Sequence, residues 1–142
     1  MVDKAVSETR QWAQDTLLPD GRRVIDQEWV QRNLAKAHAG FEFLRLINWK
    51  VAWQAETGTL SIADASTTKV YGTELYLDAV GWLLEVIGEA GYLKESSPGS
   101  VLKSRLENIY RGLVILTFGG GTNEIQRDLI SVFGLGMPMA KR

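Results

Sequence analysis

The residues in this chain that most clearly suggest chemistry are three consecutive glycines in the stretch TFGGGTNEIQR, residues 117–127. Glycines allow positive φ angles and let a ligand approach the backbone closely. A helix beginning after them would present unpaired amides, which attract phosphate and other polar ligand groups. The run lacks the spacing and the Gly-Lys-Ser/Thr ending of a P-loop, and it is not a GxGxxG motif. A helix end followed by a tight turn is the alternative interpretation.

Other side chains are weaker candidates. His38 is the only histidine, and the absence of cysteine excludes thiolate catalysis and cysteine–zinc sites. We therefore predict no metal site and a structural or exposed role for His38. Glu85 and Glu89 lie four residues apart, a spacing that suits paired carboxylate catalysis but equally two solvated surface glutamates.

Long amphipathic helices carry these candidates. Apolar residues recur at helical spacing over residues 30–51, between turn signals at residues 19–21 and 57–58. A second long helix is predicted to begin near Ser61, whose hydroxyl can cap it, and to end around residues 88–91.

Three shorter patterns complete the chain. A weaker one covers residues 3–18, a strong one runs from about residue 100 to the glycines, and a short one follows over residues 125–133. The apolar row of the strong pattern consists of Leu102, Leu106, Ile109, Leu113 and Leu116. No stretch alternates as a strand would, so we predict a single all-α domain over residues 1–142. Its expected form is an antiparallel up-and-down four-helix bundle with a short extra C-terminal helix.

The composition is that of an ordinary globular chain, with 142 residues, 45% hydrophobic content, and 16 basic against 17 acidic residues. This balance does not favour a nucleic acid or an anionic membrane as a partner. No run approaches the ~18 apolar residues of a membrane span. We therefore expect a cytoplasmic protein with no nucleic-acid or membrane partner.

The chain is rich in tryptophan, with Trp12, Trp29, Trp49, Trp53 and Trp82. We expect most of these rings to pack helix against helix. Trp49 and Trp53 lie off the main apolar stripe of their helix. This placement indicates a second buried face and hence an oligomer.

Two turns and their order carry a resemblance to a known family. The residues GTNEIQR at 121–127 follow an amphipathic helix, and an IGEAGY turn lies earlier, at residues 87–92. With PDGRRVIDQ at residues 19–27 and the two long helices, this order resembles the C-terminal helical domain of the flavin-dependent acyl-CoA dehydrogenases over nearly the whole chain. The resemblance implies a bundle that packs across a dimer interface within a tetramer. The family's N-terminal helical and middle β domains have no counterpart in residues 1–142.

The resemblance also implies a cofactor. In that family each FAD is shared between subunits, and this bundle contacts the adenine-dinucleotide end of a cofactor held mainly by the neighbour. The turn at residues 87–92 would meet the phosphates, and the last turn would meet the adenosine. The residues implied to contact FAD are Glu85, Gly88, Gly91, Gly121, Thr122 and Glu124.

One departure from the family pattern bears on catalysis. Many members have Tyr-Glu-Gly-Thr at the last turn, and that glutamate abstracts the α-proton of the acyl thioester as hydride moves to the flavin. Here Gly120 occupies the place, and glycine cannot act as a base. Other members carry the base on an earlier helix, of which residues 1–18 resemble only the end. No catalytic residue is therefore identified, and Glu85, where the family has glutamine, adds negative charge near a pyrophosphate.

Two interpretations follow. The leading one is the C-terminal domain, or a truncated subunit, of an FAD-dependent enzyme that introduces an α,β double bond into an acyl-CoA. The alternative is a non-catalytic helical interaction subunit that assembles with a catalytic flavoprotein or with itself. Both predict a homo-oligomer or pairing with a longer dehydrogenase subunit. Acyl-CoA would be a substrate of the complete enzyme only, and the isolated chain is not expected to catalyse the reaction.

Overall fold

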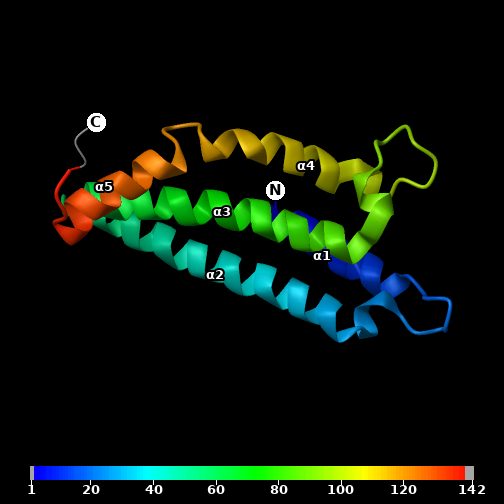
Figure 1. Ribbon diagram of the computed structural model, residues 1–142. Helices are drawn as coiled ribbons and strands as arrows, with labels where there is room; N and C mark the ends of the chain where they lie inside the picture. Colours follow the sequence, from blue (N-terminus) through cyan, green and yellow to red (C-terminus); the bar gives the residue numbers. More distant parts are fainter. Residues whose placement is uncertain (1, 140–142) are drawn as a thin grey trace. The chain divides into compact units, whose positions relative to one another are not determined.

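The computed structural model describes residues 2–139, which are mostly helical (Figure 1). The α-helices are α1 (Val2–Asp15), α2 (Glu28–Glu56), α3 (Ile62–Ile87), α4 (Arg105–Leu113) and α5 (Asn123–Leu135). Short 3-10 turns lie at Val24–Asp26, Gly88–Tyr92, Leu102–Ser104 and Val114–Thr117. Within the described residues no strand forms, and the pairing of Leu17 with Arg23 is an isolated bridge. The all-α prediction is confirmed.

The ends of the two long helices follow local chemistry. At the start of α3, the Ser61 hydroxyl accepts a hydrogen bond from the backbone N–H of Asp64 at 3.0 Å, as the sequence predicts. At its end, Gly88 has a φ of +73°, a conformation that costs glycine little and ends a right-handed helix. Among residues 2–139, no helix is both long and apolar enough to cross a bilayer.

Two predicted boundaries are wrong. The first helix ends at Asp15 instead of residue 18, because the backbone N–H of Leu18 bonds to the carbonyl of Arg22 in a tight turn at 2.7 Å. The helix predicted from about residue 100 begins at Arg105. The three residues before it, Leu102–Ser104, have φ angles of 52° to 53°. Left-handed residues cannot continue a right-handed helix, so α4 starts only after them.

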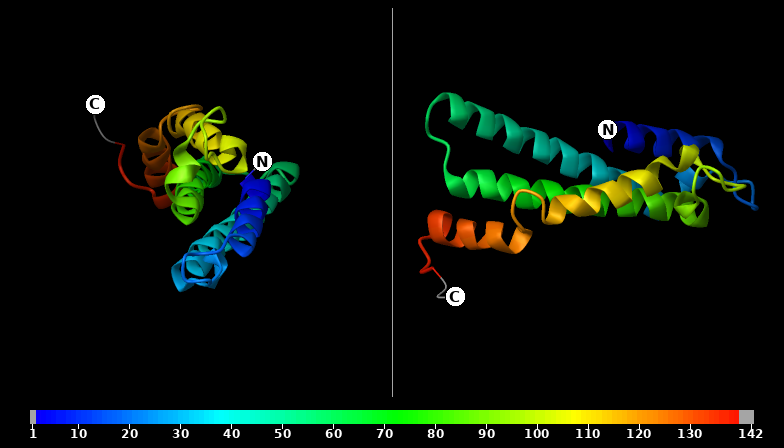
Figure 2. Two further views of the ribbon diagram at one scale, coloured as in Figure 1. Left: turned by 90° about the vertical axis from the view of Figure 1, so that its right-hand side faces the viewer. Right: turned by 90° about the horizontal axis from the view of Figure 1, so that it is seen from above.

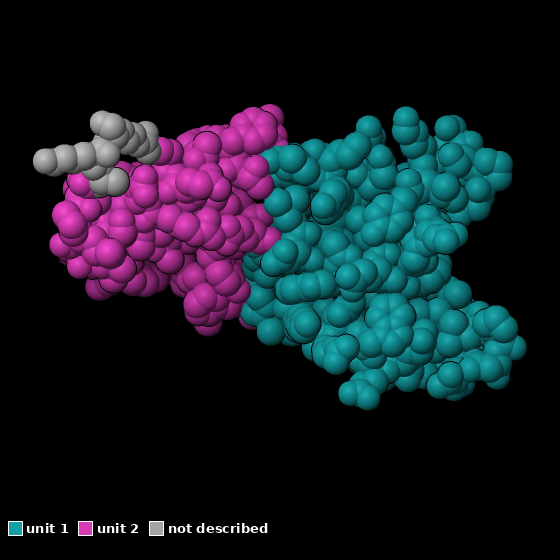
Figure 3. All heavy atoms as spheres, viewed as in Figure 1, with its two compact units in different colours: residues 1–41, 75–114 teal, residues 42–74, 115–142 magenta. Residues whose placement is uncertain are grey.

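The chain forms two compact units, drawn in different colours in Figure 3. Unit 1 consists of residues 1–41 and 75–114, and unit 2 of residues 42–74 and 115–142. Each long helix contributes one half to each unit.

Unit 1 brings four helical segments together: α1, the first half of α2, the second half of α3, and α4. Figures 1 and 2 show α4 running beside α3. The buried side chains of α4 are Leu106, Ile109 and Leu113, which confirms three members of the predicted apolar row. Leu102 and Leu116, the other two, lie outside α4 and are half-buried. They pack in a unit whose other fully buried side chains include Val30, Val80, Leu83 and Leu84. Apolar packing of bundle type therefore holds this unit together.

Unit 2 contains the second half of α2, the first half of α3, and α5. Few apolar side chains are buried in it, among them Leu44 and Val70. Small residues bring its helices close together. A Cβ added at Gly134 of α5 would lie 3.0 Å from the Cβ of Ala63 in α3. Polar contacts, described below, supply much of the remaining attachment of α5.

Candidate cofactor-contacting turns

The glycine turn in unit 2 connects the 3-10 turn Val114–Thr117 to α5. Gly119 donates its backbone N–H to the carbonyl of Ile115 at 2.8 Å, which closes the preceding helical segment. Gly120 and Gly121 then adopt φ angles of +72° and +95°. Only glycine takes up two successive left-handed conformations without strain. The tight helix-to-helix turn predicted as one alternative is present here.

Thr122 is the N-cap of α5. Its hydroxyl accepts the backbone N–H of Ile125 at 3.3 Å. Glu124, exposed in the first turn, has a lowered pKa because its carboxylate accepts a hydrogen bond from its own backbone N–H and then from the Thr122 hydroxyl. The positive charges of Arg127 and Lys69 act in the same direction. Glu124 is therefore a charged hydrogen-bond acceptor beside the turn, and Gly121, Thr122 and Glu124 lie together as predicted neighbours.

Gln126 is a residue of this turn that the sequence argument did not select. Its side-chain amide donates to the carbonyl of Gly120 at 3.0 Å. The same amide packs over Gly121, where an added Cβ would lie 2.9 Å from Gln126 Nε2. Gln126 thus closes the turn, and the φ of +95° at position 121 disfavours any residue other than glycine there. The signal available in the sequence was its place four residues after the N-cap, on the face that points back to the turn.

The second candidate turn lies in unit 1, at the end of α3. Glu85 is exposed, but its carboxylate accepts a hydrogen bond from the side-chain amide of Asn33 at 2.8 Å. Asn33 is buried on α2, and its amide lies 3.5 Å from the carbonyl of Trp82. The ammonium of Lys36 lies over the Trp82 ring, 5.6 Å from its centroid. Asn33, which the sequence argument missed, therefore orients Glu85.

Glycine is favoured at positions 88 and 91 of this turn for two different structural reasons. Gly88 needs its positive φ of +73° to end α3. Gly91 is buried, and a Cβ there would lie 3.1 Å from Leu84 Cδ2 and 3.3 Å from Ile87 Cβ. Close packing therefore favours glycine at position 91, because a side chain there would press on Leu84 and Ile87. Glu85, Gly88 and Gly91 lie together at one end of unit 1.

The tryptophans depart from the expectation that most of them pack between helices. Trp29, Trp49 and Trp53 are exposed, and 65% of Trp49 and 62% of Trp53 is accessible. With Leu46, which is also exposed, Trp49 and Trp53 recur at spacings of three and four along α2. We call Leu46, Trp49 and Trp53 the tryptophan face of unit 2. The expectation was wrong because helical spacing predicts that residues share a face of a helix, but not whether another helix covers that face.

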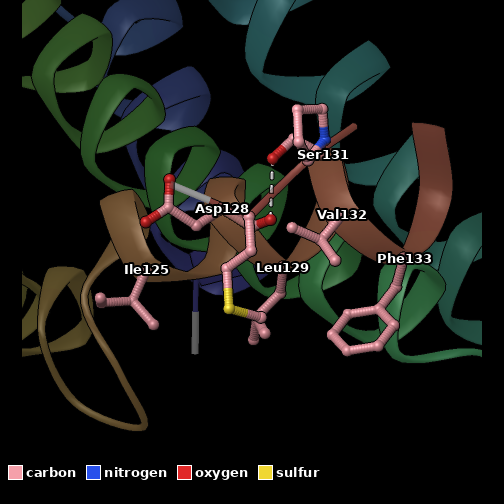
Figure 4. A pocket seen from close by; sticks show the side chains of 8 residues that line it. Ile125, Asp128, Leu129, Ser131, Val132 and Phe133 are labelled. Atoms are coloured by element: carbon pink, nitrogen blue, oxygen red, sulfur yellow. Dashed lines mark hydrogen bonds between the residues drawn. The ribbon is translucent and has the colours of Figure 1, made fainter. Parts of the chain in front are cut away.

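A hollow of about 530 Å³ lies along α5 in unit 2 (Figure 4). Its lining is mostly apolar and consists of Ile125, Asp128, Leu129, Ser131, Val132, Phe133, Pro138 and Met139. The Ser131 hydroxyl donates to the carbonyl of Asp128 at 2.8 Å, so this polar group is satisfied within the helix. The hollow offers apolar contact area and few free polar groups.

The fold and the two turns place this chain in a known class. Residues 1–134 match the model of the acyl-CoA dehydrogenase C-terminal domain, and the chain belongs to the acyl-CoA dehydrogenase family. The resemblance identified from the turns is confirmed. Related proteins of this family depend on FAD.

Particular relatives cover nearly all of the chain. Acyl-CoA dehydrogenase FadE26 of Mycobacterium tuberculosis is 51% identical over 95% of this chain and 34% of the relative. A crystal structure of the ChsE4–ChsE5 complex from Mycobacterium tuberculosis contains a chain that is 50% identical, with a TM-score of 0.90 over 98% of this chain and 36% of that one. A steroid ACAD, Tcur3481–Tcur3483, is 39% identical, with a TM-score of 0.86 over 97% and 34% of the two chains. The chain spans about a third of the length of these relatives.

Proposed function

We propose that this chain is the cofactor-contacting and subunit-assembling helical domain of an acyl-CoA dehydrogenase and does not supply the catalytic base. The observation that carries the proposal is the glycine turn. It has the backbone conformation and the exposed acceptor of a contact site for a nucleotide, and it has Gly120 where many members of the family have glutamate. The side chain of Gly120 is a single hydrogen atom, which has no basic group to accept the α-proton of an acyl-CoA.

The adenosine end of FAD suits the turn in unit 2. Adenosine presents an exocyclic amine and ribose hydroxyls, which are donors, and Glu124 is an exposed carboxylate that, like any unpaired glutamate, is an ionised acceptor at neutral pH. Thr122 and Gln126 hold the backbone of the turn in place through their bonds to Ile125 N–H and the Gly120 carbonyl. In this proposal Gly121, Thr122 and Glu124 would hold the adenosine end of FAD, which would supply the hydride acceptor of the reaction.

The phosphate end does not suit Glu85. An ionised carboxylate and a phosphate are both negatively charged hydrogen-bond acceptors, so they would repel each other. The Asn33 amide already donates to Glu85, which holds the negative charge at the end of α3. Within the proposed site, Glu85 would meet a hydroxyl of the cofactor, and groups other than Glu85 would neutralise the pyrophosphate.

Assembly is the second half of the proposal. Unit 2 exposes the tryptophan face and, elsewhere, Ile62 of α3, Ile115 and Phe118 before the glycine turn, and Phe133 of α5. Exposed apolar surface of this kind marks interaction sites. The solved relatives named above are described as a complex or with paired components, which supports a longer dehydrogenase subunit as partner. Self-association of this chain as a non-catalytic helical subunit is the alternative.

The substrate class rests on similarity and not on residues of this chain. One relative is described as a steroid ACAD. We therefore propose a CoA thioester of a steroid side chain as the first substrate to test with the assembled enzyme, with a straight-chain acyl-CoA as the comparison.

Co-expression with a longer acyl-CoA dehydrogenase subunit tests the proposal. We expect the two chains to co-purify with bound FAD, and Glu124→Gln to weaken FAD binding, measured by flavin absorbance during dialysis. Glu107→Gln is the matched control, because Glu107 pairs with Arg111 on α4, in unit 1. If this chain purified alone with FAD and oxidised acyl-CoA, the claim that it lacks catalytic competence would be wrong.

A further inference from the structure

Asn123, the first residue of α5, is buried and bonded on both sides of its amide. Its Oδ1 accepts the Lys69 ammonium at 2.6 Å and lies 3.2 Å from the Thr73 hydroxyl, whose single proton is shared with the Val70 carbonyl at 3.1 Å. Its Nδ2 donates to Glu74 Oε1 at 3.2 Å. Only 5% of Asn123 is exposed. Since a buried amide without partners is costly, the bonds to Lys69 and Glu74 specify both the residue type and its orientation.

The partners of Asn123 come from one surface of α3. Lys69 and Thr73 are four residues apart and therefore share a face of the helix, and Glu74 is adjacent to Thr73. Arg127, one helical turn after Asn123 on α5, forms an ion pair with Glu74. Along the contact the positive Lys69 is thus followed by the neutral amide of Asn123, the negative Glu74 and the positive Arg127. We call Lys69, Thr73, Glu74, Asn123 and Arg127 the α3–α5 clasp.

Lys69 bonds to both ends of the glycine turn. Besides Asn123, which follows the turn, its ammonium donates to the carbonyl of Thr117, which precedes it, at 3.4 Å. The chain between these two points contains the glycines with positive φ. Glycine is the most flexible residue, so a turn built from it is ordered only if its ends are held. One side chain from α3 therefore spans the opening of the turn.

We propose that Lys69 is a positioning residue for the glycine turn, acting through Thr117 and Asn123, and that Glu74 requires asparagine at position 123 by accepting its N–H. This inference rests on the proposed function, because the positioned turn is the one proposed to contact the adenosine of FAD. A turn that is ordered before binding loses less conformational entropy when the cofactor arrives. Lys69 and Asn123 need not touch the cofactor to affect its affinity.

Amide hydrogen exchange of the turn tests the positioning without any flavin. We expect Lys69→Met and Asn123→Asp to speed exchange of the hydrogen-bonded amides that flank the turn, those of Gly119, Ile125 and Gln126, by about tenfold or more. Lys69→Met removes the ammonium that bonds to both ends of the turn, and Asn123→Asp replaces the donor to Glu74 with a carboxylate that Glu74 repels. Lys50→Met is the matched control, since Lys50 is another lysine of unit 2 and pairs with Asp64 away from the turn. Unchanged exchange in the two clasp variants would overturn the proposal.

A double variant that swaps the acidic and the amide side chain tests the direction of the Asn123–Glu74 hydrogen bond. In the double variant Asn123→Asp with Glu74→Gln, the donor moves to position 74 and the acceptor to position 123, so the bond is restored with reversed polarity. We expect exchange in the turn to return to within about threefold of the unsubstituted chain. Thr73→Val, which keeps the size of the side chain and removes one donor to Asn123, is the milder variant should the others fold poorly. If amide hydrogen exchange in the double variant were as fast as in Asn123→Asp alone, the Asn123–Glu74 hydrogen bond would not be what holds the turn.

Flavin affinity of the complex with a longer dehydrogenase subunit separates this inference from the function on which it rests. Weaker flavin binding in Lys69→Met, with faster exchange in the turn, supports both. Faster exchange with unchanged flavin affinity would leave the positioning role intact and count against the proposed contact with FAD. Rescue of both properties by the double variant is the result expected of positioning, which a general loss of stability would not produce.

Discussion

The two compact units of this protein share the same two long helices but differ in how many apolar side chains they bury. Of the side chains described as buried and apolar within residues 2–139, Leu44 and Val70 are those that lie in unit 2, while all the others lie in unit 1. Most of the exposed large apolar side chains belong to unit 2, including Trp49 and Trp53. Unit 1 therefore has a conventional hydrophobic core, and unit 2 has apolar residues facing outward.

The difference indicates where each unit obtains its stability. Burying a large apolar side chain contributes about 1.5–3 kcal/mol, and unit 1 does this repeatedly. Unit 2 compensates with polar contacts between helices, namely the α3–α5 clasp and the bonds that Asp64 accepts from Lys50 and Gln54. A unit that leaves apolar surface exposed gains further stability when a partner covers it. This contrast supports the proposal that unit 2 supplies the surface for assembly.

The largest effect is expected in the core of unit 1. Leu106→Ala removes a side chain that is only 2% exposed and should cost about 2–5 kcal/mol of the free energy of unfolding, because the cavity left behind does not collapse fully. Chemical denaturation followed by circular dichroism measures it. Leu46→Ala on the exposed face of unit 2 is the matched control and should change stability by under about 0.5 kcal/mol. Equal losses in the two variants would remove the contrast between the units.

The next effect concerns association through unit 2. Trp49→Ser and Trp53→Ser should each weaken association by about 2 kcal/mol, or about 30-fold in Kd, because tryptophans at the centre of an interface carry much of its affinity. Sedimentation over a range of concentrations measures the Kd. Trp29→Ser is the control, since Trp29 is exposed in unit 1 and donates to Gln27. A strictly monomeric protein, with no longer subunit bound, would refute the assembly proposal.

A smaller effect is expected at the start of α5. Thr122→Ala removes the hydroxyl that accepts the N–H of Ile125 and should cost about 1 kcal/mol. Thr122→Ser keeps an oxygen in the same place and should be nearly neutral. Exchange rates of the amides in the first turn of α5 report the difference. Indistinguishable rates for the alanine and serine variants would mean that the cap contributes nothing to holding the glycine turn.

The smallest effect is a pH dependence in unit 2. The hydrogen bond from Lys50, followed by those from Ser61 and Gln54, lowers the pKa of Asp64 from 3.8 to about 2. A lowered pKa in the folded state stabilises the protein fully above pH 3.8, and this contribution is lost as the pH falls through about 2. Because the ion pair is partly solvated, we expect less than about 1 kcal/mol. Denaturation between pH 5 and 2 should show a shallower slope for Asp64→Asn than for the unsubstituted chain.

Much of the fold was predictable because it depends on residues close in sequence. The cap at Ser61, the helix end at Gly88 and the buried row of α4 all follow from periodicity and local hydrogen bonding. The predicted start of the fourth helix was wrong because periodicity does not reveal the left-handed residues Leu102–Ser104. The expectation for the tryptophans failed for a related reason, since a helical pattern identifies a face but not its neighbour.

The candidate site was predictable only in its turns. The glycines, Thr122 and Glu124 are consecutive or nearly so, and the sequence places them together. Asn33 and Glu85 are separated by 52 residues, and Lys69 and Asn123 by 54, so nothing local links them. Their polar side chains, viewed in sequence, resemble ordinary members of helix surfaces.

The sequence by itself determined the all-α class, the cap at Ser61, the helix end at Gly88, the family and the glycine at position 120, because each depends on chemistry within a few residues or on a motif. Only the tertiary structure decided that Lys69 reaches both ends of the glycine turn, that Asn123 is buried against Glu74, and that the tryptophan face is exposed. The physical reason is that burial and long-range hydrogen bonds depend on which helix faces come to lie against each other.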